Sequence, residues 1–271
     1  MNIVTGVHRS GTSFITNLVA ELGADLGDES KRLEGDEWNV KGYFENRDVT
    51  YFNDWLILGP YSRLAEEEAT ANGERRILVK LFAPFAKLRS GWGVYPKAIE
   101  RRAERRAERI REFDEELAGA TVKDVRFSLT LAAWRKRAKI DKILYTFRYP
   151  EEVAKSIQKR YNAPLSVGFK TWRNYVEEFF RAAEGIPTAM VYYNNFFEEA
   201  RRRDEINRLY AFLETPPNDE EAERVVSTTL DKRLKHNQGG ERELPADVAR
   251  LQERLLRLHE DYATLKPFST K

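Results

Sequence analysis

The segment that most constrains the fold is residues 6–13, GVHRSGTS, which has the G-x-x-x-x-G spacing of a phosphate-binding loop. A short apolar run, residues 1–5, precedes it, and residues 14–22 carry apolar side chains at helical spacing. A γ-phosphoryl group normally needs Mg²⁺ and a lysine to offset its charge, and Thr12 stands where ATP-binding loops carry that lysine. The segment therefore predicts an anion site for a nucleotide that does not donate a γ-phosphoryl group. The alternative is a plain turn between a strand and a helix.

Composition excludes several classes of protein. The net charge of +2 over 271 residues does not indicate a general nucleic-acid binder. The absence of cysteine excludes disulfides, thiolate catalysis and cysteine-ligated metals, and the three histidines are scattered without metal-ligand spacing. No apolar run approaches the roughly 20 residues that span a bilayer, and the first strand starts the chain without a leader segment. We expect a cytoplasmic protein with no metal site and no membrane span.

Four β-like segments recur, and helical sequence follows each: residues 2–7, 120–125, 142–148 and 188–193. This alternation predicts an α/β fold with a central parallel sheet flanked by helices. A further strand before residue 42 is conceivable, although the pattern is not clear there. The end of the chain is mostly helical, with helices expected at residues 198–212, 219–229 and 246–258.

The middle of the chain, about residues 61–118, interrupts this alternation and is expected to be a helical insertion within a single domain spanning 1–271. Residues 100–116 are intensely charged with few apolar anchors, which predicts one solvated helix with charge pairs along its faces. The alternative is a basic face that meets an anionic acceptor.

A second constellation starts at Arg148, the last residue of a predicted strand. Pro150 follows at a position that a first helical turn tolerates, and Ser156 lies about two turns into the predicted helix. An arginine at the end of a strand and a hydroxyl further along could hold one phosphate between them. Taken alone, each residue is more simply explained as a surface arginine or an ordinary helix serine.

Together, GxxxxGTS at the first strand and RxPxxxxxS at the later strand resemble the two nucleotide-binding signatures of sulfotransferases that use 3′-phosphoadenylyl sulfate. Residues 42–46, GYFEN, look like the GY[FW]EN segment of bacterial members, and residues 122–126, VKDVR, look like their VKDPR strand with Val125 in place of proline. The resemblance covers roughly the first 60 residues and residues 120–165. Residues 234–236, LKH, faintly resemble a cofactor-contacting segment near the end of such chains.

The resemblance implies a P-loop-like sulfotransferase fold and a nucleotide cofactor. Its 5′-phosphosulfate would lie at the first loop, on Arg9, Ser10, Gly11, Thr12 and Ser13, and its 3′-phosphate on Arg148 and Ser156. Many members carry a loop lysine that bridges to the leaving phosphate. Arg9 occupies that stretch here, and its high pKa leaves it a purely electrostatic role. Lys123 is a candidate second cation. Because a sulfuryl group carries less charge than a phosphoryl group, no metal is required.

The acceptor's proton needs a base, and the resemblance offers two carboxylates. Small-molecule members use a histidine two residues after a strand lysine, but Val125 stands there in this chain. Carbohydrate members use a glutamate after the first helix, for which Glu45 is the best counterpart and Asp124 the runner-up. The structural alternatives are a first-turn carboxylate that favours the helix dipole for Glu45 and an arginine partner for Asp124. His8 is more simply a residue that orients the loop.

The predicted function is therefore transfer of a sulfuryl group from 3′-phosphoadenylyl sulfate to a hydroxyl or amine of a carbohydrate or small-molecule acceptor, leaving adenosine 3′,5′-bisphosphate. A cluster of aromatic residues could line the acceptor cleft, although core packing explains most of it: Trp38, Tyr43, Phe44, Tyr51, Phe52 and Trp55. The alternatives are a P-loop small-molecule kinase, with Ser13 and Asp124 on Mg²⁺, and a non-catalytic nucleotide-binding scaffold. Acceptor identity and oligomeric state are not readable from the sequence.

Overall fold

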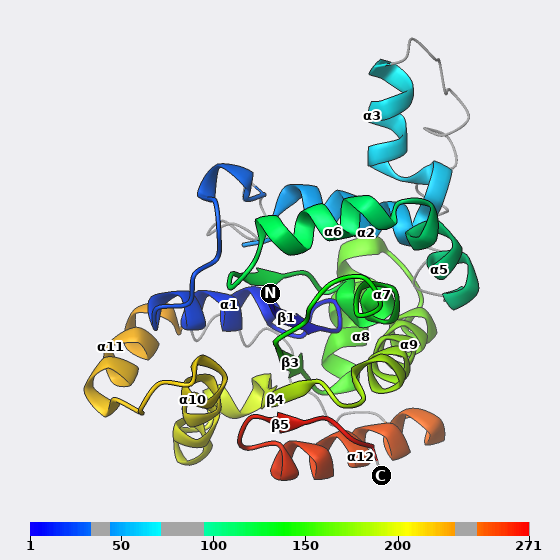
Figure 1. Ribbon diagram of the computed structural model, residues 1–271. Helices are drawn as coiled ribbons and strands as arrows, with labels where there is room; N and C mark the ends of the chain where they lie inside the picture. Colours follow the sequence, from blue (N-terminus) through cyan, green and yellow to red (C-terminus); the bar gives the residue numbers. More distant parts are fainter. Residues whose placement is uncertain (34–43, 72–94, 231–242, 271) are drawn as a thin grey trace.

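A five-stranded sheet with the order β2-β1-β3-β4-β5 forms the centre of the computed structural model, which describes residues 1–33, 44–71, 95–230 and 243–270 (Figure 1). Its strands are β1 (Asn2–Gly6), β2 (Thr121–Lys123), β3 (Lys142–Phe147), β4 (Pro187–Tyr192) and β5 (Lys266–Pro267). Strands β1 to β4 pair in parallel, and only β5 is antiparallel to its neighbour. The α/β class with a parallel sheet is confirmed, and the four predicted strands lie within two residues of their predicted ends.

Helices cover both faces of this sheet. They are α1 (Thr12–Glu21), α2 (Arg47–Leu58), α3 (Arg63–Ala71), α5 (Pro96–Arg105), α6 (Ala107–Glu116), α7 (Phe127–Trp134), α8 (Pro150–Tyr161), α9 (Leu165–Ala183), α10 (Glu199–Leu213), α11 (Asp219–Thr229) and α12 (Ala246–Asp261). Short 3₁₀ turns lie at η1 (Glu29–Lys31), η2 (Gly59–Tyr61) and η3 (Tyr193–Phe197). The three helices predicted for the end of the chain are confirmed as α10, α11 and α12.

Alternating side chains of the strands produce two hydrophobic clusters, one on each face of the sheet. Ile3 and Tyr145 belong to the cluster that includes buried residues of α2, α7, α8 and α9. Val4 and Leu144 belong to the other cluster, with buried residues of α1, α10 and α11. Figure 1 shows these two groups of helices on opposite sides of the strands. The carboxyl ends of β1, β2, β3 and β4 therefore meet at one edge, where ligands bind in open parallel sheets.

The charged segment 100–116 differs from its prediction as one solvated helix. It is two helices, because the chain leaves helical geometry at Arg106, with φ −125° between α5 and α6. Four apolar side chains of this region are buried: Ile99, Ala103, Ile110 and Phe113. Arg102 donates from Nη1 to the carbonyls of Leu56 (2.7 Å) and Ile57 (2.9 Å) at the end of α2. Arg102 thus fastens the charged segment to the end of α2.

Several predicted features lie outside the described residues. These are the possible strand before residue 42, the first two residues of the GYFEN segment, the LKH segment 234–236, and Trp38. Among the described helices, none combines the length and apolar character needed to cross a membrane.

Candidate functional site

The loop between β1 and α1 is shaped by glycines that touch other elements. A Cβ on Gly6 would lie 2.0 Å from the carbonyl oxygen of Thr146, so β1 approaches β3 closely at its end. Gly11 is the residue before α1, with φ 85°, and a Cβ there would lie 2.0 Å from Cδ2 of Tyr193. Because both positions exclude a side chain, the backbone runs close to its neighbours and presents its N–H groups at the start of α1.

The three hydroxyl residues of the loop have different surroundings. Ser10 is buried, and its Oγ donates to the carbonyls of Val7 (2.6 Å) and Thr146 (3.2 Å), so this side chain braces the loop. Thr12 is buried in the first turn of α1. Ser13 is half-buried, and its Oγ accepts a hydrogen bond from Nζ of Lys123 at 3.1 Å. The loop therefore meets a cation from the neighbouring strand at the first turn of α1.

On the other side of the loop, the structure brings together Arg9, Arg148 and Ser156. Arg9 has φ 69°, and its Nε donates to Oγ of Ser156 at 2.9 Å. Arg148 is 7% exposed and reaches back to the loop, where its Nη1 lies 3.5 Å from the carbonyl oxygen of Arg9. Among the described residues, Nη2 of Arg148 is buried without a hydrogen-bond acceptor. A buried guanidinium N–H without an acceptor fits an anion such as a phosphate oxygen.

Three residues that orient Arg148 were missed by the sequence reasoning. Glu152 accepts from Nε of Arg148 at 2.6 Å, and Asn194 in turn donates to Glu152 at 2.9 Å. The guanidinium lies over the ring of Tyr193, 4.8 Å from its centre, and burial raises the pKa of Tyr193 to about 12. Two signals could have found Glu152 and Tyr193: the i,i+4 spacing of Arg148 and Glu152, and the place of Tyr193 directly after a parallel strand.

Lys123 and Glu45 form a buried ion pair at the end of β2. Nζ of Lys123 donates to Oε1 of Glu45, and the two residues also form an isolated parallel β-bridge. Lys123 is 2% exposed and Glu45 6% exposed. Burial raises the pKa of the Glu45 carboxyl, and the ammonium of Lys123 opposes that rise. A carboxylate whose pKa is raised by burial is a stronger proton acceptor than an exposed one.

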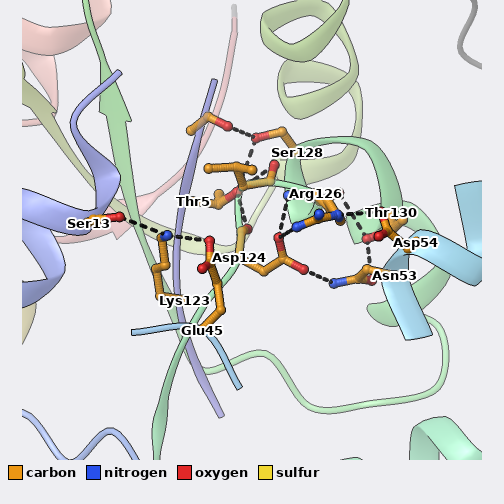
Figure 2. A network of polar contacts seen from close by, with 12 residues as sticks. Thr5, Ser13, Glu45, Asn53, Asp54, Lys123, Asp124, Arg126, Ser128 and Thr130 are labelled. Atoms are coloured by element: carbon orange, nitrogen blue, oxygen red, sulfur yellow. Dashed lines mark hydrogen bonds and ion pairs between the residues drawn. The ribbon is translucent and has the colours of Figure 1, made fainter. Parts of the chain in front are cut away.

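Asp124 lies in a separate network, which Figure 2 shows beside the Lys123–Glu45 pair. Its Oδ1 accepts from the amide and Nη1 of Arg126, both at 3.0 Å, and its Oδ2 accepts from Nδ2 of Asn53 at 2.9 Å. Arg126 also donates to Asp54 at 2.6 Å. Because Asp124 is fully buried and both oxygens are engaged, this carboxylate holds α2 and α7 against the end of β2.

His8 points its ring toward Tyr175, at 5.2 Å between ring centres and an angle of 61°. Burial holds the pKa of His8 well below its usual value, and the positive charges of Arg126, Lys123, Arg9 and Arg160 lower it further. The imidazole is therefore neutral at physiological pH. Four cations act on this one ring at the mouth of the loop, and positive charge there favours an anionic ligand.

The candidate residues thus form two groups around the loop. Arg9, Arg148 and Ser156 lie on the side of α8, and Ser13, Lys123 and Glu45 lie on the side of β2. Chemically, the first group can hold an anion, and the second can offset developing charge and take a proton. No three His, Asp or Glu residues in the described ranges come together in a way that could hold a metal ion.

Solved structures of similar arrangement include two sulfotransferases. The sulfotransferase domain of the olefin synthase of Synechococcus PCC 7002 has 13% identity and a TM-score of 0.49, with 94% of each chain covered. The sulfotransferase STF1 of Mycobacterium tuberculosis H37Rv has 13% identity and a TM-score of 0.40, with 94% of this chain and 75% of that chain covered. No family model and no curated protein matches the sequence. Both likenesses are remote, so the function is inferred from the residues of this chain.

Proposed function

We propose that the chain transfers a sulfuryl group from 3′-phosphoadenylyl sulfate to a hydroxyl or amine of a carbohydrate or small-molecule acceptor. The observation that carries this proposal is the placement of Arg9, Ser156 and the unpartnered Nη2 of Arg148 beside a phosphate loop that lacks lysine. A second anion site next to the loop suits a nucleotide with phosphate groups on both its 3′ and 5′ positions. A nucleoside triphosphate has no phosphate on its 3′ position.

The residues divide the donor between them. The amides at the start of α1, around Gly11, Thr12 and Ser13, would hold the 5′ end, because they have no partner within the helix. Arg148 and Ser156 would hold the 3′-phosphate, with Nη2 of Arg148 gaining the acceptor that it lacks in the described structure. Ser10 keeps the loop in shape through its two bonds to backbone carbonyls.

Glu45 is the proposed base. When bound, the donor supplies an electrophilic sulfur whose bond to the bridging oxygen breaks as the acceptor oxygen attacks in line. The proton of the acceptor hydroxyl passes to the carboxylate of Glu45, and adenosine 3′,5′-bisphosphate leaves. Lys123 is within hydrogen-bond distance of both Ser13 and Glu45, so its charge lies between the first turn of α1 and the base. Asp124 is better suited to positioning, since Arg126 and Asn53 already engage both of its oxygens.

The test separates the nucleotide site from the base. We expect adenosine 3′,5′-bisphosphate to raise the melting temperature more than ATP does, and Arg148→Ala to remove most of that shift. Glu45→Gln is expected to lower the transfer rate by about 10²–10⁴-fold, the usual contribution of a general base, while the nucleotide shift remains. Glu116→Gln is the matched control, because Glu116 pairs with Lys31 at the surface.

Three results would count against parts of the proposal. Equal stabilisation by ATP and by the bisphosphate would remove the reason for a 3′-phosphate site. Loss of activity in excess chelator would instead favour a Mg²⁺-dependent kinase. Unchanged turnover in Glu45→Gln would refute the assigned base without affecting the donor site.

A further inference from the structure

A cavity of about 780 Å³ lies between α2, α3 and the junction of α5 with α6. Its volume is within the roughly 300–1,000 Å³ range of small-molecule sites. The described residues that line it include five arginines, five carboxylates, and four aromatic or aliphatic residues. Among these described residues the opposite charges are equal in number, so their charges balance. None of the residues given a donor-binding role lines it.

Two arginines of the walls are stacked on aromatic rings. The guanidinium of Arg109 lies over the ring of Phe113 at 4.0 Å, and that of Arg63 lies over Tyr51 at 4.7 Å. Each is also paired with a carboxylate of its own helix, Arg109 with Glu112 (2.7 Å) and Arg63 with Glu67 (2.9 Å). Stacked and paired guanidinium groups lose less conformational entropy when a ligand binds, so the donors and acceptors of the wall are preorganised.

A third stack closes the side of the cavity near α5. Arg106 lies over the ring of Trp55 at 4.4 Å, and both of its terminal nitrogens donate to Glu68 at 2.7 Å. Arg106 is the residue at which the helix breaks between α5 and α6. The break therefore places a bidentate arginine–carboxylate pair at the wall of the cavity.

Two residues of the cavity wall follow the proposed base closely in the chain. Glu45 directly precedes Asn46, the N-cap of α2, whose side chain accepts from the amides of Asp48 and Val49. Arg47 and Asp48, the first two residues of α2, line the cavity, and Tyr51 follows one turn later. Three peptide units separate Glu45 from Asp48, so the backbone of the base and that of the cavity wall lie within about 10 Å of each other.

We propose that this cavity binds the acceptor and that the acceptor is a neutral carbohydrate, an inference that rests on the sulfuryl transfer proposed above. Sugar hydroxyls both donate and accept, so they can bond to carboxylates and guanidinium groups in turn. Because the described charges of the lining balance, together they favour neither an anionic nor a cationic acceptor. A phenol would desolvate charged walls while offering one hydroxyl, and the apolar rings of Phe52 and Phe113 are almost fully covered, at 1% and 2% exposed.

The experiment measures sugar binding directly, by titration calorimetry with and without adenosine 3′,5′-bisphosphate. The probes are cellotriose, maltotriose and chitotriose as neutral sugars, trigalacturonate as a charged sugar, and 4-nitrophenol. We expect at least one neutral trisaccharide to bind, and trigalacturonate and 4-nitrophenol to bind at least about tenfold more weakly. Arg109→Gln is expected to weaken the neutral sugar about tenfold, the scale of one lost hydrogen bond to a charged group.

Matched variants keep the outcome interpretable. Arg181→Gln removes an i,i+3 pair of the same kind with Glu178 on α9, away from the cavity, and should leave sugar binding unchanged. Glu67→Gln is a second test within the cavity, at a side chain that is 49% exposed, should Arg109→Gln not fold. Binding of no neutral sugar, tighter binding of trigalacturonate or 4-nitrophenol, or wild-type binding by both cavity variants would overturn the inference. If a neutral sugar binds but adenosine 3′,5′-bisphosphate does not, the donor assignment is refuted instead.

Discussion

Replacing Gly11 by alanine tests whether the candidate site depends on the contact between the loop and η3. Gly11 has φ 85°, and an alanine in this left-handed region costs about 1–2 kcal/mol. Its Cβ would also lie 2.0 Å from Cδ2 of Tyr193, so the ring must move, and overpacking of this kind costs a further ~1–3 kcal/mol. We therefore expect Gly11→Ala to lower the free energy of unfolding by about 2–5 kcal/mol.

Gly23→Ala is the control, because Gly23 has φ 98° and its Cβ would meet nothing within 4 Å. In Gly23→Ala the free energy of unfolding should fall only by the backbone cost of about 1–2 kcal/mol. Urea unfolding gives both values, and calorimetry with adenosine 3′,5′-bisphosphate gives the functional effect. The guanidinium of Arg148 lies over the ring of Tyr193, so a shift of this ring should displace Arg148. Nucleotide affinity should therefore fall in Gly11→Ala and be unchanged in Gly23→Ala. Equal losses of stability, within about 0.5 kcal/mol, together with equal nucleotide affinities would refute this reasoning.

Two further predictions concern buried titratable groups. The folded protein holds the pKa of His8 low, so the unfolded chain binds more protons at acidic pH. The free energy of unfolding should therefore fall as the pH drops below about 6.5, by up to ~1.4 kcal/mol per pH unit. His8→Gln should flatten this pH dependence in urea unfolding at pH 5.5, 6.5 and 7.5, and an unchanged slope would contradict the prediction. Glu205 accepts from the amide of Tyr192 (3.0 Å) and from Asn195 (2.7 Å) and lies 2.8 Å from His259. Glu205→Ala should cost roughly 3–5 kcal/mol and weaken bisphosphate binding, whereas Glu260→Ala, at a side chain 81% exposed, should do neither.

The parallel core could be predicted because its signals are local. Each of the four strands is a short apolar run followed by a helix, and the alternation itself determines a parallel sheet. The short strand β5 gave no such signal, since Lys266–Pro267 is exposed, contains proline and pairs antiparallel at an edge. Its place depends on the packing of α12 and on contacts far apart in the sequence, which a local pattern does not contain.

The break at Arg106 could not be predicted for a different reason. Residues 100–116 have strong helix formers throughout, and nothing in the sequence marks an interruption. The break accompanies two tertiary contacts: Arg106 lies on Trp55, and Arg102 donates to carbonyls at the end of α2. Here tertiary interactions override local propensity, and the same override creates the wall of the cavity. A charge pattern alone predicted a solvated surface and so concealed this role.

The missing lysine of the loop raised the question of which cation replaces it. Arg9 was the candidate from its position in the sequence, but its left-handed backbone turns Nε toward Ser156 on α8. The amine that lies against the first turn of α1 belongs to Lys123, which reaches Ser13 from the neighbouring strand β2. A cation from another strand can do what a loop lysine does, because charge at the reacting oxygens depends on distance and not on chain position. It follows that Lys123→Met should reduce transfer more than bisphosphate binding, and that Arg9→Ala should do the reverse; a larger loss of transfer in Arg9→Ala would return the role to the loop.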